Sequence, residues 1–245
     1  MNAAEQLRVA ESYPFSTLAQ KLGSGGLVVV APHPDDESLA CGGLIAEAAS
    51  SGLEIRVIIV SDGTGSHPTS RSYPAARLRE LRESEARQAV WELGLDPQRD
   101  VLFLRLPDRF VPSHGPKAEA AVLRILDCVR EVAAEALFVS WRYDPHCDHQ
   151  ASFQLASAVQ GRAPSLKLYE YTVWGAALPR ETKIEPAAGG FRLSIESRLM
   201  QKRRAIAAHR SQTTDLINDD PRGFRLTPSD LARFDTPYEF FFESA

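Results

Sequence analysis

The stretch LVVVAPHPDDESLACGG, residues 27–43, decides the fold class of this 245-residue chain. It begins with an apolar, β-branched run over 27–32, which is typical of a strand buried on both faces of a sheet. Acids and a serine come soon after this run. They fit the first turn of a helix over 37–50, because acids and hydroxyls satisfy the free backbone N–H groups at a helix start. The stretch therefore predicts a buried strand, a tight turn and a helix.

The turn between this strand and this helix carries three titratable side chains, His33, Asp35 and Asp36. In α/β proteins, ligands usually bind at this end of a strand. The proline after His33 favours an extended conformation for that residue, which aims its ring outward from the strand end. Asp36 at the helix start is held by backbone N–H groups that favour its ionised form, as suits a fixed ligand. Asp35 is then free to accept a proton.

Strand-like and helix-like segments alternate along the rest of the chain. Such alternation favours right-handed βαβ units, so we predict an α/β fold: a Rossmann-like three-layer sandwich with a mainly parallel sheet, as a single domain over 1–245. In the usual strand order 3-2-1-4-5, the first and fourth strands are neighbours. Further strands are expected over 54–60, 100–106, 136–141, 166–174 and 190–196, and further helices over 77–93, 117–134, 149–160 and 197–209.

Composition and charge exclude several classes of protein. The formal charge of -4 and an isoelectric point near 5.9 argue against a nucleic-acid partner, which normally needs a basic surface. No apolar run approaches the roughly 20 residues that span a bilayer, and the first residues lack the apolar core of a secretory signal. Three cysteines, Cys41, Cys128 and Cys147, stand at irregular spacings, which is typical of reduced thiols. We expect a cytoplasmic location; the sequence leaves the oligomeric state open, a homo-oligomer included.

A second polar motif, YDPHCDH (143–149), follows the fourth expected strand. If that strand neighbours the first, His146, Asp148 and His149 face the first motif across one crevice. A catalytic zinc site uses three nitrogen or oxygen ligands and leaves a fourth position for water. Two histidines and one carboxylate meet this need, and the remaining acids and histidines are then available for proton transfer.

The segment APHPDDESLACGG together with PHCDH resembles the LmbE-like, or PIG-L, family of zinc-dependent N-deacetylases. Members of that family remove acetyl groups from N-acetylglucosamine units of sugar conjugates. Three further segments are similar to family motifs and occur in the expected order: VSDGTG (60–65), RESEARQAVWELG (82–94) and KRRAIAAHRSQ (202–212). The resemblance therefore covers most of the chain.

The resemblance implies that His33, Asp36 and His149 hold a Zn²⁺ ion and that Asp35 is the general base. It also implies that His146 is the electrophilic or acid partner of the reaction. A thiolate ligand is the alternative use of the cysteine at position 147, but an extended loop would point it away from both histidines.

Two further site assignments also come from the resemblance. Asp148 orients the ring of His146, and Tyr143 is not at the position at which some members carry an assisting tyrosine.

The helix over 77–93 allows two interpretations of Arg82. The resemblance makes Arg82 a substrate contact, whereas the residues alone also allow an i,i+3 ion pair with Glu85 on a solvated helix face. The roles of His209, Ser211 and Gln212 in the last motif stay open.

Three smaller groups of expectations concern two glycines, the remaining histidines and one long loop. Gly42 and Gly43 predict close backbone packing of the first helix on the sheet. His67 and His114 are expected at the surface. The long loop over 61–76 is expected to form one wall of a substrate cleft and to be mobile.

These observations predict a zinc-dependent hydrolase that removes the N-acetyl group from an N-acetylglucosamine-type sugar conjugate, a small-molecule partner. One alternative is an amidase that acts on a larger acyl or thiol conjugate. Another is a metal-retaining sugar-binding protein without turnover, against which the spare base Asp35 argues. A dinucleotide-dependent oxidoreductase would need a glycine fingerprint after the first strand, where this chain has HPDD.

Overall fold

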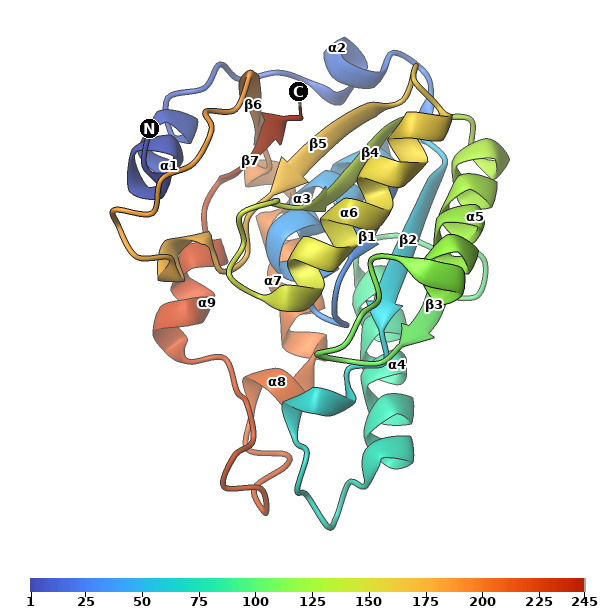
Figure 1. The fold of residues 1–245 in the computed structure, drawn as a ribbon, viewed down its shortest axis with the longest axis vertical. Coiled ribbons are helices and arrows are strands. Elements are labelled where there is room, and N and C mark those ends of the chain that lie inside the picture. The colour runs from blue at the N-terminus through green and yellow to red at the C-terminus, as the bar shows by residue number, and fades with distance from the viewer. Residues whose placement is uncertain (245) are drawn as a thin grey trace.

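A seven-stranded sheet of order β3-β2-β1-β4-β5-β7-β6 forms the middle layer of the structure, a computed structural model that describes residues 1–244 (Figure 1). The strands β1 to β5 are parallel, and β7 pairs antiparallel with both β5 and β6. The strand bounds are β1 Gly26–Ala31, β2 Ile55–Ser61, β3 Val101–Leu106, β4 Ala134–Ser140, β5 Lys167–Tyr171, β6 Gly189–Ser194 and β7 Tyr238–Glu243. The mainly parallel α/β fold and the order 3-2-1-4-5 are thus confirmed.

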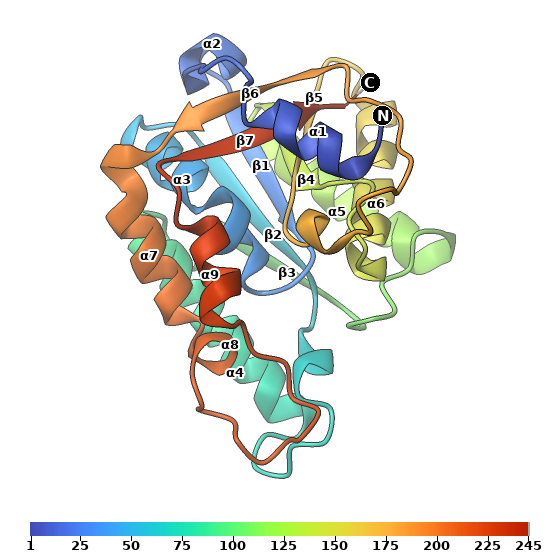
Figure 2. The same ribbon diagram turned by 90° about the vertical axis from the view of Figure 1, so that its left-hand side faces the viewer.

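Helices cover both faces of this sheet (Figures 1 and 2). The helix bounds are α1 Ala3–Ala10, α2 Leu18–Leu22, α3 Asp36–Ser50, α4 Ala75–Glu92, α5 Gly115–Glu131, α6 Cys147–Arg162, α7 Leu199–Ala208, α8 Arg210–Thr213 and α9 Pro228–Phe234. The expected helix over 197–209 begins two residues later and ends before residue 209, where the chain leaves helical geometry before α8 begins. Helices α1, α2 and α9 and strand β7 were not predicted from the sequence.

Alternate residues of β1 explain the two layers of helices. Leu27 and Val29 pack in one apolar cluster with α3 and α4, whereas Val28 and Val30 pack in a second cluster with α5 and α6. All of these side chains are fully buried. A strand that is apolar at every position, not at every second one, is what a sheet covered on both faces requires.

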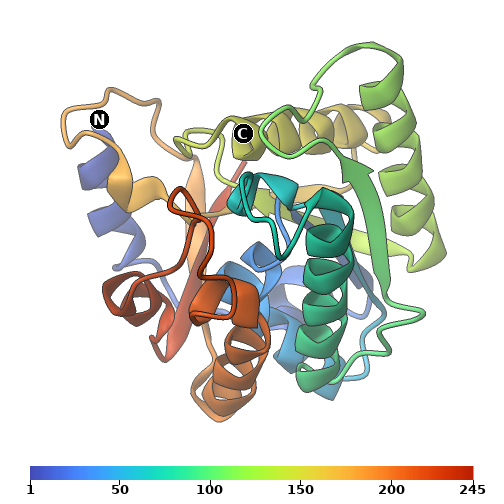
Figure 3. The ribbon, with the colours of Figure 1, turned by 90° about the horizontal axis from the view of Figure 1, so that it is seen from below.

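The loop over 61–76 is fastened to the C-terminal part of the chain. Asp219 accepts hydrogen bonds from the hydroxyl of Ser70 and from the two following backbone N–H groups, and Asp220 accepts from the backbone and side chain of Thr69. His67 in this loop is only 4% exposed, so the expectation of a surface position is wrong; His114 is exposed as expected. Loop 61–76, α4 and α8 lie at one end of the molecule (Figures 1 and 3).

The two glycines of α3 allow close approaches to different partners. An added Cβ on Gly43 would lie 2.4 Å from a side-chain carbon of Ile195, just beyond β6, and one on Gly42 would lie 3.0 Å from Lys202 in α7. The expected packing on the sheet is therefore confirmed for Gly43, whose backbone N–H also donates to Glu239 of β7, whereas Gly42 packs on α7. None of the helices within residues 1–244 combines the length and apolar character that crossing a membrane requires.

Glu239 of β7 joins three elements in the interior. Its Oε1 and Oε2 accept hydrogen bonds from the backbone N–H groups of Gly43 and Leu44, each at 2.8 Å. The Nζ of Lys202 in α7 donates to Oε1, also at 2.8 Å, and both side chains are buried. A buried carboxylate offsets its desolvation only while such partners are present. This side chain therefore ties β7 to α3 and α7.

We expect Glu239→Ala to lower the free energy of unfolding by about 3–5 kcal/mol, because it leaves the ammonium of Lys202 buried without its carboxylate. The double variant Glu239→Ala/Lys202→Met should recover part of this loss, since it buries no charge. Denaturant unfolding of the wild type and both variants measures the effect. A loss below about 1 kcal/mol, the value of a surface pair, would contradict the structural role.

Candidate active site

A cavity of about 540 Å³ lies where the parallel strands end. Residues that follow β1, β3, β4 and β5 line it, because the carboxyl ends of parallel strands share one edge of the sheet. Gly65 and Ser66 also line it, so loop 61–76 contributes to the wall as expected. The two histidine motifs, far apart in the sequence, therefore meet at this cavity.

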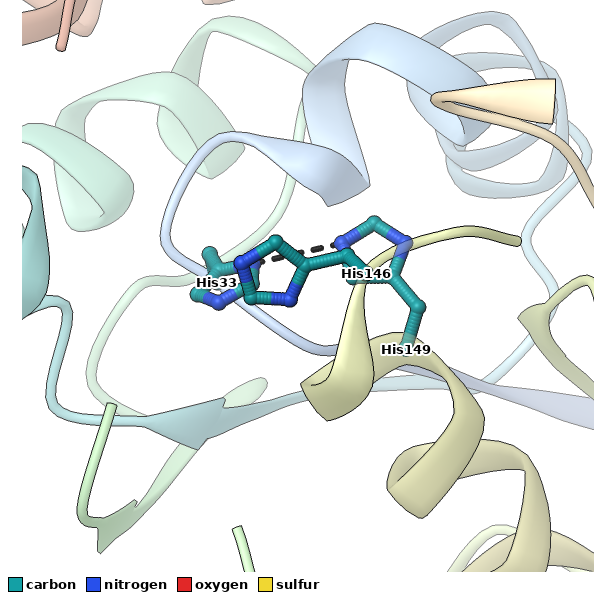
Figure 4. Close-up of side chains that lie close together, drawn as sticks. All are labelled: His33, His146 and His149. Carbon is teal, nitrogen blue, oxygen red and sulfur yellow. Dashed lines mark hydrogen bonds between the residues drawn. The ribbon is translucent and has the colours of Figure 1, made fainter. Parts of the chain in front are cut away.

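Three ligand-type atoms of His33, Asp36 and His149 form a small triangle at the cavity floor. Oδ2 of Asp36 lies 3.2 Å from Nδ1 of His33 and 3.2 Å from Nε2 of His149, and these two nitrogens are 3.3 Å apart. Figure 4 shows the rings of His33 and His149 joined by this last contact, with His146 beside them. Ligands at about 2.0–2.1 Å from a tetrahedral ion lie about 3.3 Å from one another. The triangle therefore fits one face of a tetrahedral metal site.

Carboxylates occupy the far side of both imidazoles. Nε2 of His33 lies 3.2 Å from Oδ2 of Asp148 and 3.4 Å from Oδ1 of Asp108. Nδ1 of His149 lies 3.3 Å from Oδ1 of Asp144. Metal-binding histidines characteristically present their second nitrogen to such a group, which fixes the tautomer and orients the ring. The surroundings of the triangle thus also fit a metal site.

These carboxylates favour positive charge at the floor of the cavity. Burial opposes a charge on His33, but the contact with Asp108 and its neighbours holds the pKa of His33 well above its ordinary value. Burial also opposes a charge on His149, yet Asp36 and Asp144 raise the pKa of His149 to about 9. Against the effect of burial, His149 and His33 hold the pKa of Asp36 well below its usual range. The metal-free protein therefore binds protons where a cation would bind, and the two compete.

Asp35 lies beside the triangle with an unusual backbone conformation. Its φ of 148° and ψ of -29° fall in a region that residues other than glycine rarely adopt. The residue is 6% exposed and lines the cavity. Burial raises the pKa of Asp35 to about 6, although the guanidinium of Arg82 acts in the opposite direction. A buried carboxylate next to the triangle, but not part of it, is suited to accept a proton.

Arg82 lines the cavity and supports this turn. Its guanidinium donates to the carbonyl of Pro34 at 2.6 Å and to that of Gly63 at 2.9 Å, and it lies 3.2 Å from Oδ2 of Asp35. Glu85 instead accepts hydrogen bonds from the backbone N–H and the hydroxyl of Ser211. Both Arg82 and Glu85 are buried, so the alternative of a solvated Arg82–Glu85 pair is wrong. Both side chains are buried because α4 turns this face inward. A direct contact of Arg82 with substrate stays a prediction.

His146 lies at the cavity wall at the start of α6. Its Nδ1 accepts a hydrogen bond from the backbone N–H of Asp148 at 3.2 Å, which leaves the proton of a neutral ring on Nε2. Burial, followed by the proximity of His33, lowers the pKa of His146. A neutral ring with a proton on Nε2 is able to donate a hydrogen bond to a reacting oxygen.

The expectation that the carboxylate of Asp148 orients His146 is wrong. That carboxylate is turned toward His33 and accepts hydrogen bonds from the backbone N–H groups of Arg109 and Val111. Asp148 contacts His146 only through its backbone, because residue 146 occupies the N-cap position of α6. The side chain of Asp148 therefore supports a member of the triangle.

Cys147 and Tyr143 lie outside the triangle. The thiol of Cys147 is exposed and approaches the carbonyl of Arg109 at 3.5 Å. The hydroxyl of Tyr143 accepts a hydrogen bond from the backbone of Glu185 at 3.2 Å. The Sγ of Cys147 also lies within 4.8 Å of ligand atoms of His146 and Asp148, so leaving Cys147 out of the ligand set stays a prediction.

Sequence reasoning missed three residues of this site. Asp108 and Asp144 follow β3 and β4, and their position after strand ends was a signal that could have identified them. Asp144 also accepts the backbone N–H groups of His146 at 3.1 Å and of Trp174 at 2.8 Å. Trp174 follows β5 and lines the cavity, but nothing in its local sequence distinguishes it from a core aromatic residue.

Comparison with known proteins bears directly on this geometry. Residues 28–160 match the family model PIG-L, described as GlcNAc-PI de-N-acetylase. The match covers more than half of the chain and includes both histidine motifs. The chain belongs to the PIG-L family. The family resemblance of the motifs is thereby confirmed.

Individual relatives of this PIG-L family member are distant. The 2'-N-acetylparomamine deacetylase of Streptomyces fradiae is 26% identical over 220 residues, which cover 82% of this chain and 78% of the relative. The structure of N,N'-diacetylchitobiose deacetylase from Pyrococcus horikoshii is similar with a TM-score of 0.63 at 19% identity, covering 84% of this chain and 76% of that one. A 4-carboxy-2-hydroxymuconate hydratase from Pseudomonas putida has a TM-score of 0.57 at 22% identity, covering 75% and 77%. The fold alone therefore does not decide the reaction.

We expect the purified protein to contain about one zinc ion per chain, bound through nitrogen and oxygen only. Asp36→Ala and His149→Ala should lose the ion, because each removes one corner of the triangle. Cys147→Ser is the matched control and should retain it. Elemental analysis with X-ray absorption measures both points. A zinc–sulfur distance of about 2.3 Å, or full metal content in His149→Ala, would contradict this ligand set.

Proposed function

We propose that this PIG-L family member is a zinc-dependent deacetylase that removes the N-acetyl group from an N-acetylglucosamine-type sugar conjugate. The observation that carries the proposal is the triangle of His33, Asp36 and His149 with the carboxylate of Asp35 beside it. Such a pair of features supplies a metal position and a separate base. A sugar-binding protein without turnover would need no buried base at this place, so the arrangement favours catalysis.

Zinc is the ion that suits this donor set. Two imidazole nitrogens and one carboxylate oxygen are the ligands of many catalytic zinc sites, in which a further position stays open. When bound, the ion supplies Lewis acidity, which polarises the acetamide carbonyl and makes water a stronger acid. The rest of the reaction is carried by side chains of the chain itself.

Asp35 is the general base in this proposal. As the oxygen of a water molecule bonds to the carbonyl carbon of the acetamide, the carboxylate of Asp35 takes the water proton. Its pKa of about 6 in the metal-free site leaves it mostly ionised at pH 7 and still basic enough to accept that proton. The guanidinium of Arg82 keeps the carboxylate on the cavity side of the turn.

His146 acts on the other side of the reacting carbon. Its Nε2–H donates a hydrogen bond to the carbonyl oxygen as negative charge develops there. The carbon–nitrogen bond then breaks, and the amine nitrogen takes up the proton that Asp35 received from the water. The products are acetic acid, which ionises to acetate, and the free amino sugar, so atoms and protons balance.

An aromatic wall supports a sugar conjugate as the substrate. Trp174 and Phe224 line the cavity with their rings edge to face at a centroid distance of 5.8 Å. The backbone of Trp174 is held by Asp144, which also contacts the second nitrogen of His149. The wall is thus fixed relative to the triangle. Apolar surface beside a few placed polar groups is typical of small-molecule sites, and a pyranose ring presents apolar C–H faces to such a wall.

The test is to incubate the zinc-loaded protein with a panel of N-acetylglucosamine conjugates and to measure acetate and free amine together. We expect both products in equal amounts from at least one conjugate. A parallel series of N-acyl groups of increasing length distinguishes the alternative of an amidase for larger acyl conjugates, which would prefer the longer groups. Absence of acetate from the whole panel, together with hydration of an enol acid assayed as a separate substrate, would overturn the deacetylase proposal.

Two substitutions separate the proposed roles. Asp35→Asn should keep zinc and fold but lose about 100- to 10,000-fold in kcat, the usual contribution of a general base. His146→Ala should also keep zinc and lose kcat by a factor of about 100 or more, because it removes a hydrogen bond made in the transition state. Kinetics and metal analysis on the same preparations measure both. Wild-type rates in either variant, or loss of zinc from Asp35→Asn, would contradict the assignment.

A further inference from the structure

The chain between α7 and α8 reaches the turn that carries Asp35. His209 lies in this break between the helices and is 1% exposed. Its Nε2 lies 2.8 Å from Oε1 of Glu37 in the first turn of α3, 172 residues earlier in the sequence. The same oxygen accepts a hydrogen bond from the hydroxyl of Ser38 at 2.7 Å. Glu37 is fully buried, so these contacts are formed without competition from solvent.

The other oxygen of Glu37 holds the backbone of Asp35. Oε2 accepts a hydrogen bond from the N–H of Asp35 at 2.9 Å. One carboxylate thus links the imidazole of His209 on one side to the peptide of Asp35 on the other. Since the φ of Asp35 is 148°, this peptide lies in a conformation that persists only where the surroundings over-determine it.

Further contacts keep His209 itself in place. Ser211, two residues later, donates from its backbone N–H at 2.7 Å and from its hydroxyl at 2.6 Å to Glu85 of α4. Gln212 donates to the hydroxyl of Ser211 at 2.8 Å. The motif HRSQ, over 209–212, is therefore a buried polar segment that α4 and α3 hold from two sides.

The position of His209 separates it from the reacting groups. It does not line the cavity, and its Nδ1 has no hydrogen-bond partner among residues 1–244. Its one charged contact at hydrogen-bond distance is Glu37. Its Nε2 also lies 3.2 Å from the hydroxyl of Ser38, which donates to the same oxygen of Glu37. The hydrogen bonds that link His209 to the turn at Asp35 therefore converge on Glu37.

We propose that His209 and Glu37 are positioning residues for Asp35. His209 fixes the carboxylate of Glu37, and Glu37 fixes the peptide of Asp35 in the conformation that points its side chain at the cavity. The inference rests on the proposed function, in which Asp35 is the general base. It assigns a role to the histidine of the last sequence motif, and a reason why the first motif continues from HPDD to a glutamate.

The experiment compares His209→Gln and Glu37→Gln with His114→Gln, a control that makes the same substitution at an exposed histidine outside this network. With the most active conjugate of the panel, we expect kcat to fall by about 10- to 100-fold in His209→Gln, as for other residues that orient a catalytic group. KM and zinc content should not change. Glu37→Gln keeps an oxygen for the N–H of Asp35 and should lose less, and the control should match the wild type.

A double-mutant cycle distinguishes positioning from a general structural role. In an Asp35→Asn background, His209→Gln should change kcat less than about twofold, because the group it positions is already absent. An equal loss of kcat in both backgrounds would overturn the proposal. Should His209→Gln not fold, the same cycle with Glu37→Gln decides.

A crystal structure of zinc-loaded His209→Gln gives a second measurement that needs no substrate. We expect the φ of Asp35 to leave its positive value or the side chain to turn from the cavity. An unchanged turn would overturn the positioning role whatever the substrate is. Wild-type kcat in Asp35→Asn, together with a displaced turn in His209→Gln, would instead overturn the role of Asp35 in the proposed function and leave the structural link intact.

Discussion

The contact of one carboxylate, that of Asp36, with two imidazoles from distant segments is the interaction on which the rest of the site depends. His33 follows β1 and His149 lies in α6 after β4, and these strands are paired at five positions, with a register shift after the first pair. The pairing brings the two rings side by side at the Asp36 oxygen. Several carboxylates and imidazoles thus share one buried volume, with ligand atoms about 3.3 Å apart. The buried carboxylates need positive charge beside them, which either protons on the imidazoles or a cation supplies.

The carboxylates around this contact are each satisfied by the backbone. Asp148 accepts N–H groups from the segment after β3, and Asp144 accepts those of His146 and Trp174. Such bonds hold acids in their ionised form in a buried place, since hydrogen bonds to a carboxylate favour its charged state. They also fix parts of the site relative to one another, because Asp144 accepts the backbone N–H of Trp174 in the aromatic wall and lies beside the ring of His149. The aromatic wall and the triangle thus share Asp144 as a common support, and with it the proposed sugar binding and the proposed metal chemistry.

The C-terminal third of the chain makes two contacts with α3. Glu239 of β7 accepts hydrogen bonds from backbone N–H groups in the middle of this helix, and His209 contacts Glu37 in its first turn. Both contacts act on the helix whose start carries Asp35 and Asp36. Because the fold is shared with a hydratase, the sheet by itself does not select the reaction.

The sequence by itself determined the parallel α/β sheet, its strand order and the two histidine motifs at one edge, because apolar runs and strand–helix alternation are local properties. The choice of His33, Asp36 and His149 as one ligand set came from the family resemblance of the two motifs, not from these local patterns. Only the tertiary structure decided that Asp148 serves His33 and not His146, that Arg82 turns inward to the turn of Asp35, and that β7 joins the sheet. Side-chain partners that come from separate elements depend on how helices rotate on the sheet, and no short stretch of sequence encodes that rotation.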